Sequence, residues 1–452
     1  MHVGIVNWSL YRTRGGLERV ANMLAEAMRL RGDDVSIFYQ TSRDTGKGPS
    51  YPLPEGARII GLAIDEYGPD LEAARRAVCE SGIDILVPMF SWGDLVWFPW
   101  LLQGSGIPML VSEHSSPENV VRKWSRTERT ACMDLADHIH VLTESAAATF
   151  PPDMRSRLSV IPNAAKFEDD TPREKVKPEK KILLGLGRLE EKPKQFSLLI
   201  KAFALIAPSF PDWDLRLCGD GKSYKDYIAL VNELGLAERV QFSGMVTNVA
   251  AEYTAARLFC IPSKFEGFPT VCIEAQHFGV PIVAFADCPG VNEIVIHGEN
   301  GLLADEMTAD SLAKSLSALM RDETLSKKLG ERGKKLLNRY EPGRVFDQWE
   351  KVLERVIASG QPTRLELAGK GLAGGPESRE LLNRAHPLDR RAYIQQYRRA
   401  RRERAPSPFT ENEIARFIRQ MQRCCIPGYR LSSKCLKSKL FRLVKTVNRM
   451  KC

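Results

Sequence analysis

A pair of glutamates, Glu266 and Glu274, could carry chemistry because seven residues separate them across an expected strand–loop–helix junction. They lie in the run IPSKFEGFPTVCIEAQHFGVPIVA, in which a strand is expected to end near Pro262 and a glycine-containing loop to follow. A helix is expected to begin near Pro269 or Thr270, since proline favours the first turn of a helix. Either glutamate alone is as well explained by a surface charge that matches a helix dipole, but the whole run predicts a ligand site.

The start of this expected helix is a candidate phosphate site. Its free N–H groups, around Thr270 and Val271, and the positive end of the helix dipole favour an anion. Glu274, about one turn into the helix, can face the same crevice and accept hydrogen bonds from a ribose diol. Glu266, on the loop, can reach a sugar beyond the phosphates. The run therefore predicts a site for a nucleotide that carries a sugar.

The elements that position this site follow from the hydrophobic pattern. Short apolar runs alternate with amphipathic segments of helical length, which is typical of parallel sheets covered by helices on both faces. Strands are expected at residues 2–6, 35–39, 84–89, 109–112, 139–143 and 159–161 and then, after a polar linker at 171–181, at 182–186, 214–218, 240–243, 258–262, 281–285 and 301–303. The predicted fold is α/β, with two facing, Rossmann-like, doubly wound domains and a basic C-terminal extension.

Four segments are predicted. An acceptor-side domain spans residues 1–168, a donor-side domain 169–340, a closing helix 341–358 and a basic, partly helical tail 359–452. The 452 residues are too many for one compact core, which supports two domains.

The first expected helix, LERVANMLAEAMRLRG, carries a row of apolar residues. Val20, Leu24, Met28 and Leu30 are expected on one side of it, and Gly32 is expected to end it.

The glutamate run closely resembles the E-x7-E signature of the retaining glycosyltransferases of family 4, which have the two-Rossmann glycosyltransferase-B (GT-B) fold. The segment GRLEEKPKQFSLLIKAF resembles that family's Gly-Arg-Leu…Lys element, which places an arginine and a lysine on the donor diphosphate. The resemblance assigns these roles to Arg188 and Lys194. Gln195 stands where the family usually has glycine, and Lys192 lies close enough in sequence to compete with Lys194. Two fixed cations and a helix N-terminus would stabilise a departing nucleoside diphosphate.

Other family elements match in the same order. Gly15 and Gly16 occupy the loop that in the family closes on the donor diphosphate, and the GDG turn at residues 219–221 and Phe242 would line the nucleotide pocket. The GDG turn is explained equally well by a structural turn.

His114 follows the fourth strand at its carboxyl end, where ligands bind in such sheets. The family often has a histidine there that faces the reacting sugar. A helix-capping or inter-domain hydrogen-bonding histidine is an equal alternative. His140, within HIHVL, is predicted to be structural.

The resemblance thus implies two groups of site residues. The catalytic group is Glu266, His114, Arg188 and Lys194; the donor-binding group is Gly15, Gly16, Gly219, Gly221, Phe242, Gly267, Phe268, Pro269, Thr270, Val271 and Glu274.

Neither a metal nor a cofactor is expected beyond the donor itself. No Asp-x-Asp motif follows a strand at a pocket edge, and the ten cysteines form no C-x-x-C pair. A UDP-sugar is favoured over a GDP-sugar as the donor.

The positive charge is concentrated at the C-terminus. The chain has a net charge of +9, yet residues 361–452 alone hold 22 Lys and Arg against 7 Asp and Glu. Five arginines lie within residues 398–404, and the last stretch places Leu436, Leu440 and Leu443 at helical spacing among basic residues. This favours a helix on an anionic membrane; packing on the catalytic domains and nucleic-acid binding, the least favoured, are the alternatives.

The expected protein is cytoplasmic, with possible attachment to the inner face of the plasma membrane, because it has no apolar run long enough to span a bilayer and no leader pattern. The segment SWGDLVWFPWLL predicts either an acceptor or membrane-facing patch or an aromatic core helix.

The expected activity is sugar transfer to a glycan or lipid-linked acceptor in cell-surface polysaccharide or lipopolysaccharide synthesis. A nucleotide-sugar epimerase or phosphorylase, a non-catalytic nucleotide-sugar-binding protein and a nucleic-acid binder are the alternatives.

Overall fold

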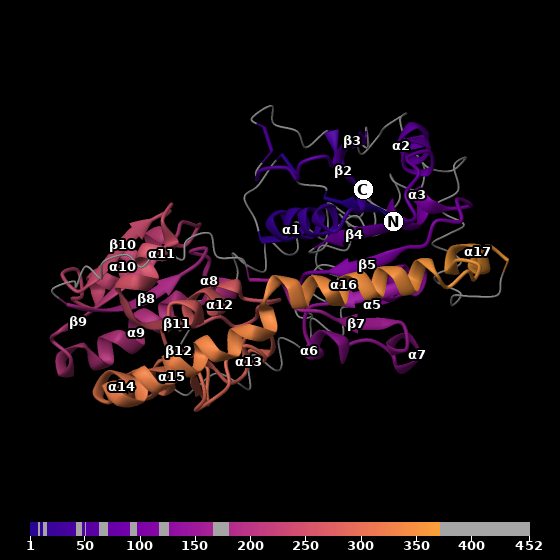
Figure 1. Cartoon of the computed structure of the whole chain (residues 1–452). Helices are drawn as coiled ribbons and strands as arrows, with labels where there is room; N and C mark the ends of the chain where they lie inside the picture. Colours follow the sequence, from indigo (N-terminus) through magenta and orange to yellow (C-terminus); the bar gives the residue numbers. More distant parts are fainter. Residues whose placement is uncertain are drawn as a thin grey trace, which may run out of the picture. The chain divides into compact units, whose positions relative to one another are not determined.

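The computed structural model describes residues 1–7, 10–11, 16–41, 48–49, 51–62, 71–90, 97–116, 126–165 and 180–370. Within them the chain forms two parallel sheets, each belonging to one α/β domain (Figure 1). The predicted fold class is confirmed.

The first domain is built on a seven-stranded sheet. Its strands are β1 (His2–Val6), β2 (Asp34–Gln40), β3 (Arg58–Leu62), β4 (Ile85–Phe90), β5 (Leu110–Glu113), β6 (His138–Val141) and β7 (Leu158–Val160). They lie in the order β3-β2-β1-β4-β5-β6-β7, so the direction of winding reverses between β1 and β4. The helices along this part of the chain are α1 (Gly16–Leu30), α2 (Leu71–Cys79), α3 (Trp97–Leu102), α5 (Arg126–Asp134), α6 (Glu144–Ala147) and α7 (Pro152–Arg155).

The second domain repeats this plan on six strands. They are β8 (Lys181–Leu186), β9 (Trp213–Cys218), β10 (Val240–Gly244), β11 (Ala256–Ile261), β12 (Ile282–Phe285) and β13 (Gly301–Ala304), in the order β10-β9-β8-β11-β12-β13. Its helices are α8 (Glu191–Lys194), α9 (Phe196–Ile206), α10 (Tyr224–Glu233), α11 (Val249–Ala255), α12 (Thr270–His277), α13 (Pro289–Asn292), α14 (Ala309–Arg321) and α15 (Glu323–Leu336). Short 3-10 turns follow α9 at Ala207–Ser209 and α15 at Leu337–Tyr340.

The second sheet is buried on both faces. Leu183 and Leu215 belong to one apolar cluster, whereas Ile182 and Leu184 belong to another. Because successive side chains of a strand point to opposite faces, one continuous apolar strand serves both clusters. Ligands in sheets of this kind bind at the carboxyl ends of the strands, where the direction of winding reverses.

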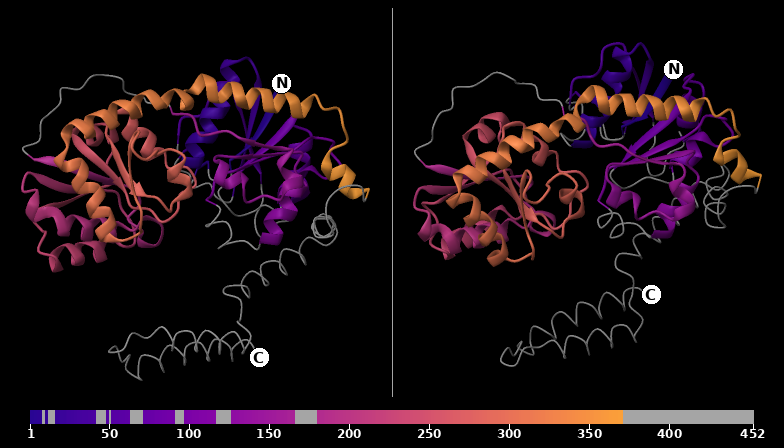
Figure 2. Two further views of the ribbon diagram at one scale, coloured as in Figure 1. Left: turned by 90° about the horizontal axis from the view of Figure 1, so that it is seen from below. Right: turned by 60° about the horizontal axis from the view of Figure 1, so that its bottom comes forward.

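After the second domain the chain returns to the first. Helix α16 (Pro342–Ile357) buries Val345, Trp349 and Leu353 in the first domain's core, and it lies along that domain in both views of Figure 2. Its apolar residues recur at helical spacing and so form one stripe. Helix α17 (Arg364–Gly369) follows, and the Arg364 side chain pairs with Asp134 at 2.9 Å.

Most expected strands coincide with observed ones to within two residues, but β3 was missed. Its sequence, RIIGL, contains a charge and a glycine and is only partly buried at the sheet edge, so it lacks the continuous apolar run of the inner strands. The expectation for Leu30 was wrong: it is 82% exposed, because the buried stripe of α1 runs through Ala21, Leu24 and Met28.

Three predicted segments, the linker, the C-terminal tail and the aromatic segment, lie partly or wholly outside the described residues. Residues 171–179 of the expected linker and everything after residue 370 lie outside the described residues. In the aromatic segment, Phe98 and Leu101 of α3 are buried, which favours the core-helix interpretation for this part of it. Within the described residues, no helix is both long and apolar enough to cross a membrane.

Candidate active site

A partly buried ion pair joins two candidate catalytic residues. Lys194, the last residue of α8, donates from Nζ to Oε1 of Glu266 at 2.6 Å; their side chains are 20% and 13% exposed. The Ser263 hydroxyl donates to the same oxygen at 2.6 Å. The Lys264 amide donates to the Pro193 carbonyl at 2.9 Å and so fixes the glutamate loop against α8.

The two neighbouring lysines differ in their contacts. Lys192 is exposed, whereas the ammonium of Lys194 is held at the glutamate. Gln195 separates α8 from α9 and has φ +47° and ψ +39°, the left-handed region. A glycine, which the family usually has here, adopts that conformation without steric cost.

The glycines beside this pair allow backbone segments to pack closely. A Cβ atom at Gly219 would lie 1.9 Å from the Gly187 carbonyl oxygen, and one at Gly221 would lie 2.3 Å from the Leu189 carbonyl oxygen. The GDG turn therefore has a structural role, because it supports the loop that carries Arg188. The Arg188 side chain is 72% exposed, and its guanidinium lies 3.8 Å from Glu190 in a loose ion pair, which leaves it able to bind an anion.

Helix α12 begins directly after the loop that carries Glu266. The helix begins at Thr270 with Pro269 as N-cap, as expected, and no side chain caps it. The N–H groups of Thr270 and Val271 therefore remain available to an anion, because they have no acceptor within the helix, whereas the Cys272 N–H donates to the Pro269 carbonyl at 3.0 Å. Phe268, just before it, packs edge-on against Tyr340 with ring centroids 5.8 Å apart.

Glu274 lies on α12 with two polar neighbours. Its carboxylate oxygens are 3.2 Å from the Tyr253 hydroxyl and 4.0 Å from the Arg19 guanidinium of α1. Burial raises the pKa of the Glu274 carboxyl, and the Arg19 charge acts in the opposite direction. Burial also raises the pKa of Tyr253, which therefore keeps its proton and can donate.

The loop after Glu266 approaches the first domain at His114. A Cβ atom at Gly267 would lie 2.9 Å from the His114 carbonyl oxygen, and one at Gly290 would lie 2.2 Å from the Glu266 carbonyl oxygen. Only glycine fits such approaches without movement of the backbone. The His114 backbone therefore lies against the loop that carries Glu266.

His114 is partly buried and belongs to a polar group whose other members, Ser112 and His140, are buried. Its Nε2 is 2.8 Å from Ser112 Oγ, which is 2.7 Å from His140 Nδ1. Burial lowers the pKa of His114 to about 3, with a smaller effect from His140, so the ring is neutral at ordinary pH. Just before it, Glu113 forms a buried two-point ion pair with Arg129, at 2.8 and 2.6 Å.

The contacts of the remaining predicted site residues do not indicate a bound ligand. Gly15 lies outside the described residues, and Gly16 is the first residue of α1. A Cβ atom at Gly16 would touch no atom of the described residues. Phe242 packs edge-on against Tyr224, with ring centroids 5.5 Å apart, and Val271 packs against the second domain's core.

Sequence reasoning missed the partners of these residues. Ser263, Tyr253 and Arg19 contact the two glutamates, and Ser112 contacts His114. Of these, Ser263 had a usable signal, since it stands three residues before Glu266 at the end of a strand.

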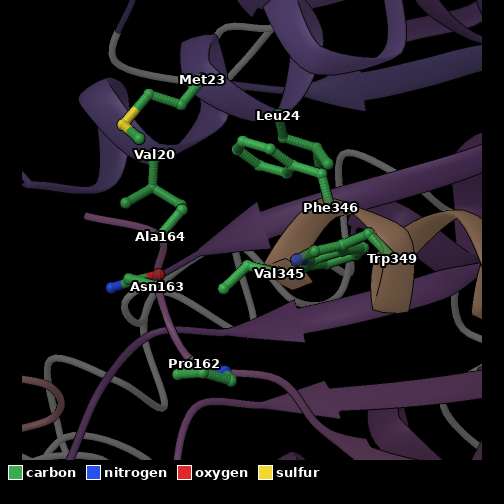
Figure 3. A pocket seen from close by; sticks show the side chains of 9 residues that line it. All are labelled: Val20, Met23, Leu24, Pro162, Asn163, Ala164, Val345, Phe346 and Trp349. Atoms are coloured by element: carbon green, nitrogen blue, oxygen red, sulfur yellow. The ribbon is translucent and has the colours of Figure 1, made fainter. Parts of the chain in front are cut away.

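A small cleft lies between α1 and α16 (Figure 3). It is lined by Val20, Met23, Leu24, Pro162, Asn163, Ala164, Val345, Phe346 and Trp349. The lining is almost entirely apolar, so the cleft does not supply the charges that a diphosphate needs. Within the described residues, no group of three or more His, Cys, Asp or Glu side chains could hold a metal ion.

Two family models match successive parts of the chain. "Glycosyltransferase Family 4" matches residues 14–168, and "Glycosyl transferases group 1" matches residues 166–336. The chain belongs to glycosyltransferase family 4. It is therefore a transferase of the GT-B type, and the epimerase and non-catalytic alternatives lose their support.

Relatives of this transferase extend over most of its length. An uncharacterized glycosyltransferase of Haemophilus influenzae is 28% identical over 75% of this chain and 96% of its own length. The phosphatidyl-myo-inositol mannosyltransferase of Mycobacterium leprae is 27% identical over 81% of this chain and its whole length. Among solved structures, Anabaena HepE in complex with UDP and glucose matches with a TM-score of 0.65 and 19% identity, over 78% of this chain and 99% of its own. This last match supports the fold.

Proposed function

We propose that this family 4 enzyme transfers a sugar from a nucleoside-diphosphate sugar to a hydroxyl of a glycan or lipid-linked acceptor, with retention of anomeric configuration. UDP is the favoured nucleotide, and neither a metal nor another cofactor takes part. The observation that carries the proposal is the Lys194–Glu266 ion pair beside the uncapped start of α12.

The donor's diphosphate is recognised by positive charge from three sources. Lys194 and Arg188 supply full charges, and the start of α12 supplies N–H groups and the positive end of its dipole. In the structure Glu266 neutralises Lys194, so a bound diphosphate competes for that ammonium while Ser263 keeps its hydrogen bond to the glutamate. These cations stabilise the charge that grows on the leaving diphosphate, which a metal ion does in other transferases.

The other carboxylate, on Glu274, serves the nucleoside. A ribose diol donates two hydrogen bonds, which a carboxylate accepts well. The Tyr253 hydroxyl lies beside this carboxylate, 3.2 Å from Glu274 Oε2 and 3.0 Å from the Val271 carbonyl oxygen, so these two acceptors share its proton. Binding of the diol replaces water around a carboxylate that burial already makes costly to ionise.

Retention follows from attack on the face from which the diphosphate leaves. The acceptor oxygen forms a bond to the anomeric carbon, the bond to the diphosphate oxygen breaks, and the acceptor's proton passes to that oxygen. No protein base is then needed on the opposite face. His114 contributes as a neutral hydrogen-bonding group near the Glu266 loop.

The acceptor is proposed to be a glycan or lipid-linked molecule of the cell surface. The M. leprae relative is named for a phosphatidyl-inositol acceptor, and a Campylobacter jejuni relative, 26% identical over 76% of this chain and 96% of its own length, for an undecaprenol-linked glycan. Such acceptors lie at a membrane surface, and we propose that the basic residues of 398–449 attach this cytoplasmic enzyme to anionic lipid. That segment lies outside the described residues.

Release of nucleoside diphosphate from UDP-, GDP- and ADP-sugars, with and without EDTA, tests the donor proposal. We expect turnover of one donor that EDTA leaves unchanged and that Glu274→Ala abolishes. Glu331→Ala, which changes an exposed glutamate on α15, is the matched control and should act as wild type. Turnover that needs added metal, or equal activity in both variants, would refute the assignment.

Two further measurements complete the test. Proton NMR of the first product should show that the donor's anomeric configuration is kept, and an inverted product would reject retention.

Sedimentation with phosphatidylserine vesicles tests membrane attachment. The vesicles should capture the wild type at low salt but not a variant in which the arginines of 398–404 are changed to glutamine. Equal capture of both would reject membrane attachment through this segment.

A further inference from the structure

A line of hydrogen-bonding groups crosses the first sheet behind His114. His140 Nε2 is 2.8 Å from the Ile161 carbonyl oxygen, and His140 Nδ1 is 2.7 Å from Ser112 Oγ. That hydroxyl is in turn 2.8 Å from His114 Nε2. The groups come from β5, from β6 and from the residue after β7, so the sheet itself sets their spacing.

The direction of each hydrogen bond follows from the Ile161 carbonyl oxygen, which can accept a hydrogen bond but cannot donate one. A carbonyl oxygen accepts, so His140 carries its proton on Nε2. Burial lowers the pKa of His140 to about 3, so the ring is neutral and Nδ1 has a lone pair. Ser112 must then donate to Nδ1, and its oxygen accepts from His114 Nε2–H. His114 is left with an unprotonated Nδ1.

Burial and ring packing hold the hydrogen-bonded groups of Ser112, His140 and His114 in place. Ser112 is fully buried and His140 is 1% exposed. The Trp349 ring of α16 packs on the His140 ring with centroids 4.3 Å apart. The centroids of the His114 and His140 rings are 5.9 Å apart. His138, on the same strand, is the other titratable group that acts on His140, and it lowers the pKa further.

We propose that Ser112 and His140 are positioning residues that keep His114 neutral with its proton on Nε2, so that Nδ1 accepts a hydrogen bond from a substrate hydroxyl. This inference rests on the proposed function, in which His114 is a neutral hydrogen-bonding group near the Glu266 loop. A sugar or acceptor hydroxyl can donate to Nδ1, whereas the opposite tautomer would present an N–H and would not accept.

Nitrogen NMR of the full-length protein labelled with ¹⁵N-histidine tests the tautomer directly. The signals of His114 are assigned as those that disappear in His114→Gln. We expect one tautomer, with Nε2 protonated and Nδ1 unprotonated, at pH 7. A proton on Nδ1, or an average of both tautomers, would overturn the proposal whether or not the protein turns over a donor.

Kinetics separate a positioning role from a structural one. Ser112→Ala should lower kcat about tenfold with KM nearly unchanged, since the hydrogen-bonding group is misplaced and not removed. Ser36→Ala is the matched control, because Ser36 is also fully buried on a strand of this sheet and bonds to a histidine, His2 Nε2, at 2.9 Å. It should match Ser112→Ala in thermal stability and keep wild-type kcat.

Failure of this inference can be told apart from failure of the proposed function. Equal kcat in Ser112→Ala and Ser36→Ala would overturn the positioning role. A His114→Gln variant with wild-type kcat would overturn the role of His114 in the proposed function, and with it the part of the inference that concerns the substrate. The tautomer measured by NMR decides the rest.

Discussion

Gln195 holds a backbone conformation that costs stability, so its replacement by glycine should stabilise the protein. Its φ of +47° is the only positive value among the described non-glycine residues. A left-handed conformation costs a residue with a Cβ about 1–2 kcal/mol, whereas glycine loses about 0.5–1 kcal/mol more in chain entropy on folding. The Gln195 side-chain oxygen is also buried without a partner, which adds to its cost. We expect Gln195→Gly to gain about 1 kcal/mol.

Urea unfolding and thermal scans measure this gain. For a domain of this size, 1 kcal/mol raises Tm by about 3 °C. Gly235→Ala is the opposite control: φ there is +69° and a Cβ atom would touch nothing, so its effect comes from the backbone alone. It should lose about 1 kcal/mol. If Gln195→Gly fails to stabilise while Gly235→Ala destabilises as expected, the strain argument is wrong.

Three other outcomes are expected. Lys194→Ala should lower kcat at least a hundredfold in the nucleotide-release assay and Lys192→Ala should not; similar losses in both would contradict the assignment. Glu113→Gln, which leaves its buried arginine partner unpaired, should cost about 3–5 kcal/mol in urea unfolding, and a loss below 1 kcal/mol would show that the pair is solvated. His114 and His140 have pKa values lowered to about 3 in the folded protein, so the unfolded chain binds more protons between pH 6.5 and 3. Stability should therefore fall as the pH drops through this window, by about 1.4 kcal/mol per pH unit for each histidine, and unfolding free energies that stay constant from pH 6.5 to 5 would refute this.

The elements that carry the proposed donor site were predictable because their signals are local. Glu266, the start of α12 and Glu274 lie within nine residues of sequence, and one strand–loop–helix junction positions all of them. Lys194 is separate in sequence, but it too follows a strand whose apolar run is continuous. Strand ends and helix starts can be located from hydrophobic pattern and capping residues.

The tertiary partners could not be predicted in the same way. Ser112, Tyr253 and Arg19 lie within regular elements, where nothing in the pattern distinguishes them from other polar residues. His140 was predicted to be structural because it is mid-strand in HIHVL, but its role depends on which residues of β5 and β7 lie beside it. Strand register is set by the whole sheet, so one strand's sequence does not reveal these contacts.

The return of α16 to the first domain makes that domain discontinuous in the chain. Residues 342–357 complete a core that residues 3–161 begin, and the whole second sheet is inserted between them. During synthesis the second domain can therefore finish folding while the first still exposes apolar surface that α16 covers in the finished protein. A nascent chain stopped near residue 340 would expose the groove that receives Phe346, Trp349 and Leu353. The first domain's core therefore stays incomplete until residues 342–357 have left the ribosome.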